Sequence, residues 1–182
     1  MEDLSLHILD IAENSLNAGA RQIGITIRED LGKDLLTIEV VDDGRGMEEH
    51  EAQRATDPFY TTRTTRRVGL GLGLLLQAAH AANGDLDISA TPGKGMTVRA
   101  TFQLSHLDRK PLGNMAETIT VLIAGRPDVD FTYRHERNGW SLWFSTQELK
   151  SRLGEVPLND PETLSFVRLY LTQEEQSIQH HS

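Results

Sequence analysis

The 182-residue sequence predicts an α+β fold, a two-layer sandwich with helices on one face of a mixed sheet. Apolar residues recur at three- and four-residue spacing over residues 4–17, as in an amphipathic helix. Two pairs of alternating segments follow, one on each side of further helical segments. The order helix, two strands, helix, loop, helix, two strands is typical of helices layered on one face of a sheet.

Asn17 and Gly19 mark the end of the first helix, and the first pair of strands follows it. Residues 23–27 and 36–40 alternate between apolar and polar side chains, and a polar turn separates them, so they predict a hairpin. A short helix is expected over residues 48–55.

Residues 56–70 have little apolar periodicity and predict a long loop, a feature that in compact domains is usually functional or disordered. A helix is expected from Gly71 to about Ala82. Strands at 86–90 and 98–104 then form a second hairpin.

A polar linker, residues 106–114, separates a domain at 1–105 from a small α+β extension at 111–182. In the extension, Asn138-Gly139 between two aromatic segments predicts a hairpin. Helices are expected at 115–124, 146–153 and 161–173, with a frayed end after them. The aromatic residues are expected to form a small core rather than a partner-docking face; they are Phe131, Tyr133, Trp140, Trp143 and Phe144.

The amino-acid composition excludes several kinds of site and several classes of protein. There are no cysteines, which excludes disulfides and thiolate metal sites and favours a reducing, cytoplasmic location. We expect neither a membrane span nor a secretory signal, because the sequence has no long apolar run and no basic start. The net charge of −9 argues against nucleic acid as a partner.

Two polar residues share one face of the first helix. Asp10 and Asn14 are four residues apart, and their oxygens suit a Mg²⁺ ion with its water shell. The carboxylate could instead orient or deprotonate a water molecule. A polar helix edge, or a capping interaction, is the simpler alternative for this pair alone.

Glycines follow a strand-end carboxylate in residues 42–46. Asp42 can accept a hydrogen bond, for example from an exocyclic amine, while Gly44 and Gly46 allow close approach to a flat base. The alternative is a plain turn, in which Asp-Gly is common.

Three more glycines, Gly69, Gly71 and Gly73, open a helix whose exposed N–H groups suit phosphate. Their spacing fits neither a dinucleotide fingerprint nor a P-loop, and a flexible hinge is the alternative. A cationic segment precedes them, namely Arg63, Arg66 and Arg67. Residues 92–95 are expected to be a hairpin turn.

Together these stretches resemble the ATP-binding module of the GHKL superfamily, shared by gyrase, a heat-shock chaperone, MutL and sensor histidine kinases. Residues 13–20 are similar to the MutL asparagine motif, and residues 57–63 and 69–74 to the lid of histidine kinases. The resemblance covers about residues 4–104 and implies a Bergerat-type fold.

The resemblance also implies roles for the residues. Asn14 would bind Mg²⁺ and Asp42 would accept from the adenine amino group of ATP, in a pocket shaped by Gly44 and Gly46. The three helix-opening glycines would wrap the phosphates beneath a lid that carries the three arginines.

Two positions depart from the family pattern. Asp10 replaces the glutamate of the family's ATPases and is one methylene shorter, with Glu13 as a weaker substitute. Met96 stands where a threonine usually follows the glycines, and Thr97 comes one place later, on the other face of a strand. His7 and His80 are expected to be packing or surface residues rather than phosphoacceptors. Only nine residues precede Asp10, so self-phosphorylation in the sensor-kinase manner is not expected.

Three functions are consistent with this resemblance. The first is a stand-alone Mg-ATP-binding regulator that acts on a partner protein by phosphoryl transfer or by a nucleotide-gated contact. The second is an ATP hydrolase that uses Asp10 as the base and cycles as a homodimer. The third is a non-enzymatic interaction module, to which Met96 lends weight.

Overall fold

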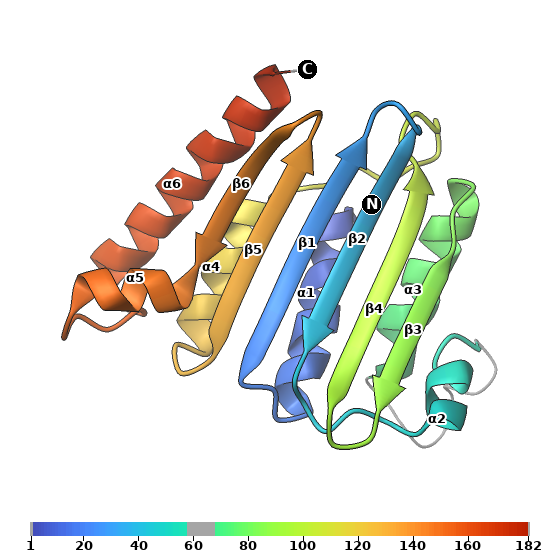
Figure 1. The fold of residues 1–182 in the computed structure, drawn as a ribbon, viewed down its shortest axis with the longest axis horizontal. Coiled ribbons are helices and arrows are strands. Elements are labelled where there is room, and N and C mark those ends of the chain that lie inside the picture. Colours follow the sequence, from blue (N-terminus) through green and yellow to red (C-terminus); the bar gives the residue numbers. More distant parts are fainter. Residues whose placement is uncertain (1, 58–67, 182) are drawn as a thin grey trace.

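The computed structural model describes residues 2–57 and 68–181, with the backbone alone for residues 68–70. A six-stranded mixed sheet runs through the described chain, in the order β3-β4-β2-β1-β5-β6 (Figure 1). Every neighbouring pair is antiparallel except β1 and β5, which are parallel. The strands are β1 Gln22–Asp30, β2 Leu35–Asp42, β3 Leu86–Thr91, β4 Gly95–Gln103, β5 Asp130–Arg137 and β6 Trp140–Ser145.

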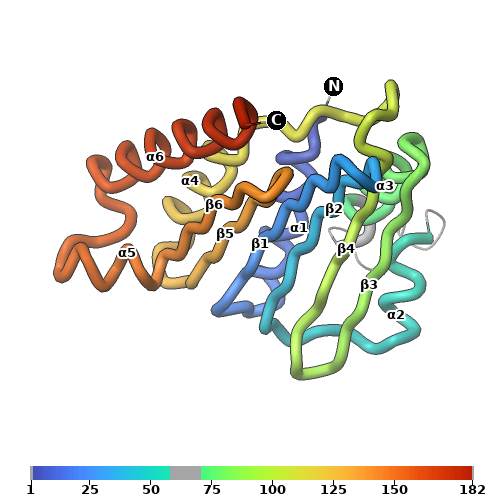
Figure 2. The backbone as a smooth tube through the Cα atoms, turned by 45° about the horizontal axis from the view of Figure 1, so that its top comes forward, coloured from blue at the N-terminus to red at the C-terminus, as the bar shows by residue number. Residues whose placement is uncertain are grey.

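Helices α1, α3 and α4 lie across one face of this sheet, and α6 packs against α4 beside β6 (Figures 1 and 2). The helices are α1 Leu4–Asn17, α2 Glu49–Arg54, α3 Val68–Ala81, α4 Met115–Gly125, α5 Thr146–Leu153 and α6 Pro161–His180. The predicted α+β class, with helices on one face of a mixed sheet, is therefore confirmed. No helix in the described ranges combines the length and the apolar character needed to cross a bilayer.

The core lies between the helices and the sheet because the strands alternate in burial. Ile23, Ile25 and Ile27 of β1 are buried on the helix-covered face, whereas the residues between them face the open side of the sheet. The same alternation runs through β2, β4 and β5. Burial of one apolar face per strand supplies the main stabilisation and fixes the register.

Local signals in the sequence set the ends of the elements. Asp3 caps α1 by accepting from the amide of Leu6, and the chain leaves α1 through Gly19 at φ +77°. Asn138 and Gly139 both have positive φ at the β5–β6 turn, as the predicted two-residue hairpin requires.

The C-terminal region joins the same sheet instead of building a separate one. β5 pairs with β1 from Gln22↔Asp130 to Glu29↔Arg137, so these two neighbouring strands of the sheet are more than 100 residues apart in sequence. The linker contacts the start of α1, where the amide of Leu4 donates to the carbonyl of Pro111 at 2.9 Å.

Two expectations for this region were wrong in part. The C-terminal helix does not end near residue 173 but continues to His180, because Ile178 is buried against the core. The aromatic residues divide: Phe131, Tyr133 and Phe144 are core residues, whereas Trp140 and Trp143 are 51% and 49% exposed.

Candidate functional site

Asp42 ends β2 on the helix-covered face of the sheet and is nearly buried. The Ser15 hydroxyl on α1 donates to Asp42 Oδ2 at 2.6 Å, and the Gly44 amide donates to Oδ1 at 2.9 Å. Each carboxylate oxygen has two lone pairs, so both oxygens can accept one more hydrogen bond. The carboxylate is therefore held in one orientation and remains an acceptor.

Ser15 was not predicted as a site residue, although it lies within residues 13–20, the stretch that resembles the asparagine motif. It is 1% exposed, on the same face of α1 as Ile8 and Ile11. A hydroxyl on the buried, apolar face of a helix needs a hydrogen-bond partner. This requirement was the one signal in the sequence that could have pointed to Ser15. The partner, Asp42, is 27 residues away, which periodicity alone does not reveal.

The loop after Asp42 is fixed by main-chain contacts that leave little room for a side chain at Gly44 and none at Gly46. A Cβ on Gly44 would lie 3.0 Å from the carbonyl oxygen of Ala18. A Cβ on Gly46, where φ is +65°, would lie 2.2 Å from the carbonyl oxygen of Thr91. The loop therefore lies wedged between the α1–β1 turn and the β3–β4 turn.

The turn at residues 92–95 is the predicted hairpin turn, and it also holds the loop after Asp42. The Gly93 amide donates to the carbonyl of Arg45 at 2.7 Å. At Gly95, with φ +92°, a Cβ would lie 1.9 Å from the carbonyl oxygen of Asp42. Glycine stretches 50 residues apart in sequence thus form one packed unit at the end of β2.

The helix predicted to start at Gly71 begins three residues earlier, at Val68, so Gly71 and Gly73 lie inside α3, and Gly71 comes to the polar face of α1. A Cβ on Gly71 would be 3.6 Å from Asp10 Cβ and 4.0 Å from Asn14 Nδ2, both ordinary contact distances. Gly73 has open space beside it. Gly69 lies in the first turn of α3, and the exposed amides of such a turn are suited to an anion.

Asp10 is the ionisable residue of this group. Its pKa is raised, first by partial burial and then by the charge of Glu2, while His7 acts in the opposite direction. A carboxylate with a raised pKa is a better proton acceptor near neutral pH.

The two histidines occupy the positions expected of packing and surface residues. His7 is buried on α1, and burial followed by the Lys110 charge lowers its pKa. His80 is exposed and lies 3.2 Å from Asp85.

The residues present fit a magnesium ion that is held mainly by a phosphate ligand. In the described part of the chain, no group of three or more His, Cys, Asp or Glu side chains is arranged so that it could hold a metal ion by itself. Mg²⁺ usually keeps several waters and binds one or two protein oxygens besides substrate phosphates. Asn14 and Asp10, facing the start of α3, can supply those oxygens.

Three of the predicted site residues have no described position, and a fourth position departs from the family pattern. Arg63, Arg66 and Arg67 fall outside the described residues. Met96 pairs with Asp42 in the β2–β4 register and shares its face, so Thr97 points to the opposite face, as its one-place shift predicts.

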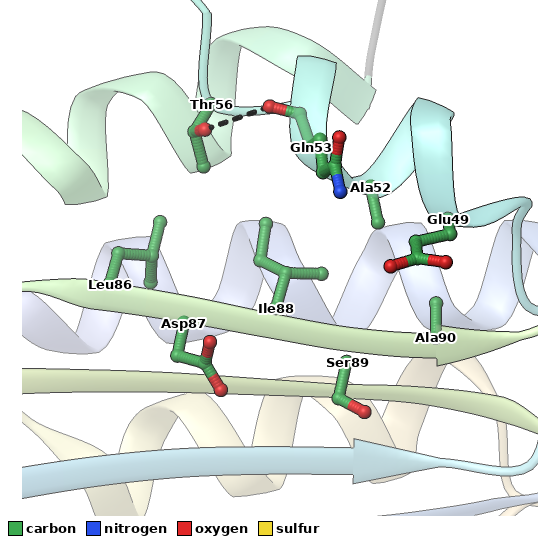
Figure 3. Close-up of a pocket in the computed structure, with 9 residues that line it drawn as sticks. All are labelled: Glu49, Ala52, Gln53, Thr56, Leu86, Asp87, Ile88, Ser89 and Ala90. Atoms are coloured by element: carbon green, nitrogen blue, oxygen red, sulfur yellow. Dashed lines mark hydrogen bonds between the residues drawn. The ribbon is translucent and has the colours of Figure 1, made fainter.

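A separate hollow of ≈ 540 Å³ lies between α2 and β3 (Figure 3). Leu86, Ile88 and Ala90 project toward α2, while Asp87 and Ser89 point away from it. None of the predicted site residues lines this hollow. It is therefore distinct from the Asp42 site.

The fold itself resembles a known one. A solved structure described as the N-terminal domain of a DNA repair protein has a TM-score of 0.53 and 17% identity to this chain. The match covers 79% of this chain and 52% of that one, and at this identity it concerns the fold alone.

Curated relatives match the first part of the chain. The anti-sigma F factor of Caldanaerobacter subterraneus subsp. tengcongensis is 38% identical over 88 residues, which are 47% of this chain and 57% of that protein. The anti-sigma F factor of Thermoanaerobacter sp. (strain X514) is 33% identical over 102 residues, which are 54% of this chain and 67% of that protein. A putative sensor protein of Shewanella frigidimarina is 30% identical over 103 residues, or 56% and 16% of the two chains.

The chain thus spans less than two thirds of the Caldanaerobacter and Shewanella proteins. Residues 2–106, more than half of the 182, match the family described as histidine kinase-, DNA gyrase B-, and HSP90-like ATPase. With the fold and the packed glycine stretches, this match establishes that the chain belongs to that ATPase family.

Proposed function

We propose that the chain binds Mg-ATP at the Asp42 site and, in the nucleotide-bound state, regulates a partner protein. The observation that carries the proposal is that α1 contacts both halves of the site. Its Ser15 holds Asp42, and its Asp10 and Asn14 face Gly71 of α3. The base-accepting carboxylate and the phosphate-facing helix are thereby fixed relative to each other.

In this arrangement each residue has one task. Asp42 accepts from the adenine amino group with the acceptor positions that Ser15 and Gly44 leave free. Gly44 and Gly46 keep the loop close to the base, and Asn14 holds Mg²⁺ on the phosphates. The arginines Arg63, Arg66 and Arg67 neutralise phosphate charge.

The action on a partner is either phosphoryl transfer or a nucleotide-gated contact. Relatives named anti-sigma F factors support a protein as the target. We further propose that residues 1–105 carry the nucleotide site and that residues 111–182 serve in contacts with other chains.

The test is equilibrium binding of Mg-ATP labelled at the γ-phosphate. Asp42→Ala should lose binding at least tenfold, because a buried hydrogen-bond acceptor for the base is removed. Asn14→Ala should weaken binding in Mg²⁺ but have little effect without it. Each site variant has a matched control at an exposed residue. Asp87→Ala on β3 is the control for Asp42→Ala, and Asn17→Ala at the end of α1 is the control for Asn14→Ala. Unchanged affinity in both site variants would refute the proposal.

A second function, ATP hydrolysis by water, is favoured by the raised pKa of Asp10 beside Asn14. Asp10 would accept a proton from the attacking water, as ADP leaves with the electrons of the broken bond to the γ-phosphorus. Free phosphate that disappears in Asp10→Asn, with nucleotide affinity retained, would establish it. Label that remains on ATP would favour the regulator.

A further inference from the structure

The sequence contains two Asn-Gly pairs, at residues 83–84 and 138–139. In such a pair the amide nitrogen of the glycine can attack the side-chain carbonyl carbon of the asparagine, because glycine has no side chain to shield that nitrogen. Both asparagines have positive φ, +54° at Asn83 and +48° at Asn138, so the two pairs start from similar backbone conformations. The surroundings of each pair therefore decide its reactivity in the folded chain.

The pair Asn83-Gly84 is held in place at the end of α3. The Gly84 amide donates to the carbonyl of Ala79 at 2.8 Å, and Asn83 Nδ2 donates to Gln103 Oε1 at 2.8 Å. A Cβ on Gly84 would lie 1.7 Å from the carbonyl oxygen of Thr101, so main chain packs directly on this glycine. The nitrogen and the side chain that would have to meet are thus both engaged in other contacts.

The pair Asn138-Gly139 is unrestrained by comparison. It forms the two-residue turn between β5 and β6, at one end of the sheet (Figure 1). Both residues are exposed, and a Cβ on Gly139 would meet no atom within 4 Å. Within residues 2–57 and 68–181, neither the Gly139 amide nor the Asn138 side chain has a hydrogen-bond partner. A hollow of ≈ 490 Å³ adjoins the turn and has both residues in its lining, so water can reach them.

We propose that Asn138 is a site of self-modification, at which the folded chain converts asparagine into aspartate and isoaspartate. The Gly139 nitrogen gives its proton to a solvent base and forms a bond to Asn138 Cγ, while the bond from Cγ to the side-chain nitrogen breaks and releases ammonia. The resulting five-membered succinimide takes up one water. Opening at one ring carbonyl gives aspartate, and opening at the other gives isoaspartate. Neither an oxidant nor a nucleotide takes part, so the proposal does not depend on the proposed function.

The fold should slow this reaction to different extents at the two pairs. Ring closure requires the asparagine to leave its turn conformation. Nothing packs against Gly139, so a local opening of the β5–β6 turn is sufficient there. At Asn83 two hydrogen bonds and the close contact with Thr101 must be lost first. We therefore expect Asn138 to react at least about tenfold faster than Asn83 in the folded chain.

The product should alter the shape of the turn as well as its charge. The two-residue turn pairs Arg137 with Trp140. Isoaspartate adds one methylene to the main chain between these two residues, and the lengthened turn no longer matches the twist of the strands. Trp140 directly follows the turn, and its ring centroid lies 4.0 Å from that of His181, so we expect this ring contact to loosen.

The first test incubates the full chain at pH 8 and follows each asparagine by mass spectrometry. Cleavage after glutamate gives residues 137–148, in which Asn138 is the only asparagine. Cleavage after lysine and arginine gives residues 68–94, in which Asn83 is the only one. The first fragment should gain acid at least about tenfold faster than the second and should separate into two products of equal mass. Equal rates in the folded chain would overturn the proposal.

The second test repeats the incubation in concentrated urea, where both pairs lose their contacts. The two rates should then approach each other, and a ratio that unfolding leaves unchanged would show that the flanking sequence, not the fold, selects Asn138. Asn138→Gln would have to close a six-membered ring and should leave the mass of its fragment constant. Asn83→Gln is the matched control and should react at position 138 as the wild type does. Acid that still forms in the Asn138→Gln fragment would refute the assignment.

Discussion

The glycine-rich loops around Asp42 and the C-terminal region around His135 are held by different kinds of contact. At Gly46 and Gly95 main chain approaches main chain so closely that a Cβ would overlap carbonyl oxygens. At His135 the contacts are between ionisable side chains. The first region should therefore respond to added volume and the second to protonation.

His135 is completely buried between two carboxylates on different elements. Its Nε2 lies 2.8 Å from Glu29 on β1, and its Nδ1 lies 2.8 Å from Glu175 on α6. Tyr133 also donates to Glu175, and Arg137 pairs with Glu29. The cluster therefore joins α6 to the central strands through β5.

Protonation decides the strength of this cluster. Burial alone would lower the pKa of His135, but hydrogen bonds to Glu175 and Glu29 outweigh it and raise the pKa to about 9. Burial opposes ionisation of Glu29 as well, yet His135 and Arg137 hold its pKa below the ordinary value. At neutral pH the histidine is thus a cation, held between the carboxyl groups of Glu29 and Glu175.

Removal of the imidazole should have the largest effect on stability. His135→Ala leaves two carboxylates facing each other without the cation, and loss of one partner from a buried charge cluster costs about 3–5 kcal/mol. The measurement is urea unfolding followed by tryptophan fluorescence, which reports on the C-terminal region because both tryptophans lie in β6.

The matched control is His80→Ala, which removes an exposed histidine with a single surface contact to Asp85. Its free energy of unfolding should change by less than about 0.5 kcal/mol. Similar losses in the two variants would show that the His135 cluster does not hold α6.

The glycine-rich region is tested by a single methyl group. Gly95→Ala forces a Cβ into the carbonyl of Asp42 at φ +92° and should cost about 3 kcal/mol of folding free energy. Gly93→Ala, two residues away, has φ +76° but open space around its Cβ, and should cost about 1 kcal/mol. Chemical unfolding followed by circular dichroism measures both, and equal costs would contradict the steric account.

The stability of the C-terminal region should fall at alkaline pH. Because the folded pKa of His135 is about 9 and its ordinary value is 6.5, this contribution is complete below pH 6.5 and is lost as the pH rises through 9. From the shift, the loss between pH 7 and 9.5 is about 2 kcal/mol. The lowered pKa of Glu29 has the opposite consequence at acid pH, because its contribution to folding stability is lost as the pH falls below 4.5.

Urea unfolding at pH 5.5, 7, 8.5 and 9.5 measures this loss. The raised pKa of Tyr133 keeps its hydroxyl protonated over this range. His135→Gln cannot titrate and should show a flat profile above pH 7. A wild-type profile as flat as that of His135→Gln would show that the histidine is not protonated in the folded chain.

Local features of the sequence could be predicted, whereas contacts between distant segments could not. Alternation in residues 23–27 and the Asn138-Gly139 pair act locally, and the structure has the expected hairpins at both places. The parallel pairing of β1 with β5 was not predicted, because it joins segments more than 100 residues apart and leaves no local pattern. For the same reason the cluster of Glu29, His135 and Glu175 could not be found from spacing.

Within the candidate site, glycines were predicted as junctions but their packing was not. Gly95 is an ordinary turn residue in the sequence, and its contact with Asp42 appears only when β2 and β4 pair. The end of α6 was missed because Ile178 is a single apolar residue in a polar tail. Its burial depends on the core that the preceding helices form.

The smallest predicted effect concerns Ser15, the contact between α1 and the Asp42 carboxylate. Ser15→Ala removes the 2.6 Å hydrogen bond to Oδ2 but leaves the Gly44 amide on Oδ1, so the carboxylate stays in place with more freedom. Under the proposed function, Mg-ATP affinity should fall about fivefold, equivalent to about 1 kcal/mol. Isothermal titration measures the change.

Ser5→Ala is the control for Ser15→Ala, because Ser5 is also buried on α1 but bonds to Asp3, at the other end of the helix. Its nucleotide affinity should equal that of the wild type. If Ser15→Ala binds as tightly as Ser5→Ala, main-chain packing alone positions Asp42. The glycine-rich region would then need no side-chain contact from α1. It would be held by main-chain contacts alone, whereas the His135 cluster is held by side chains.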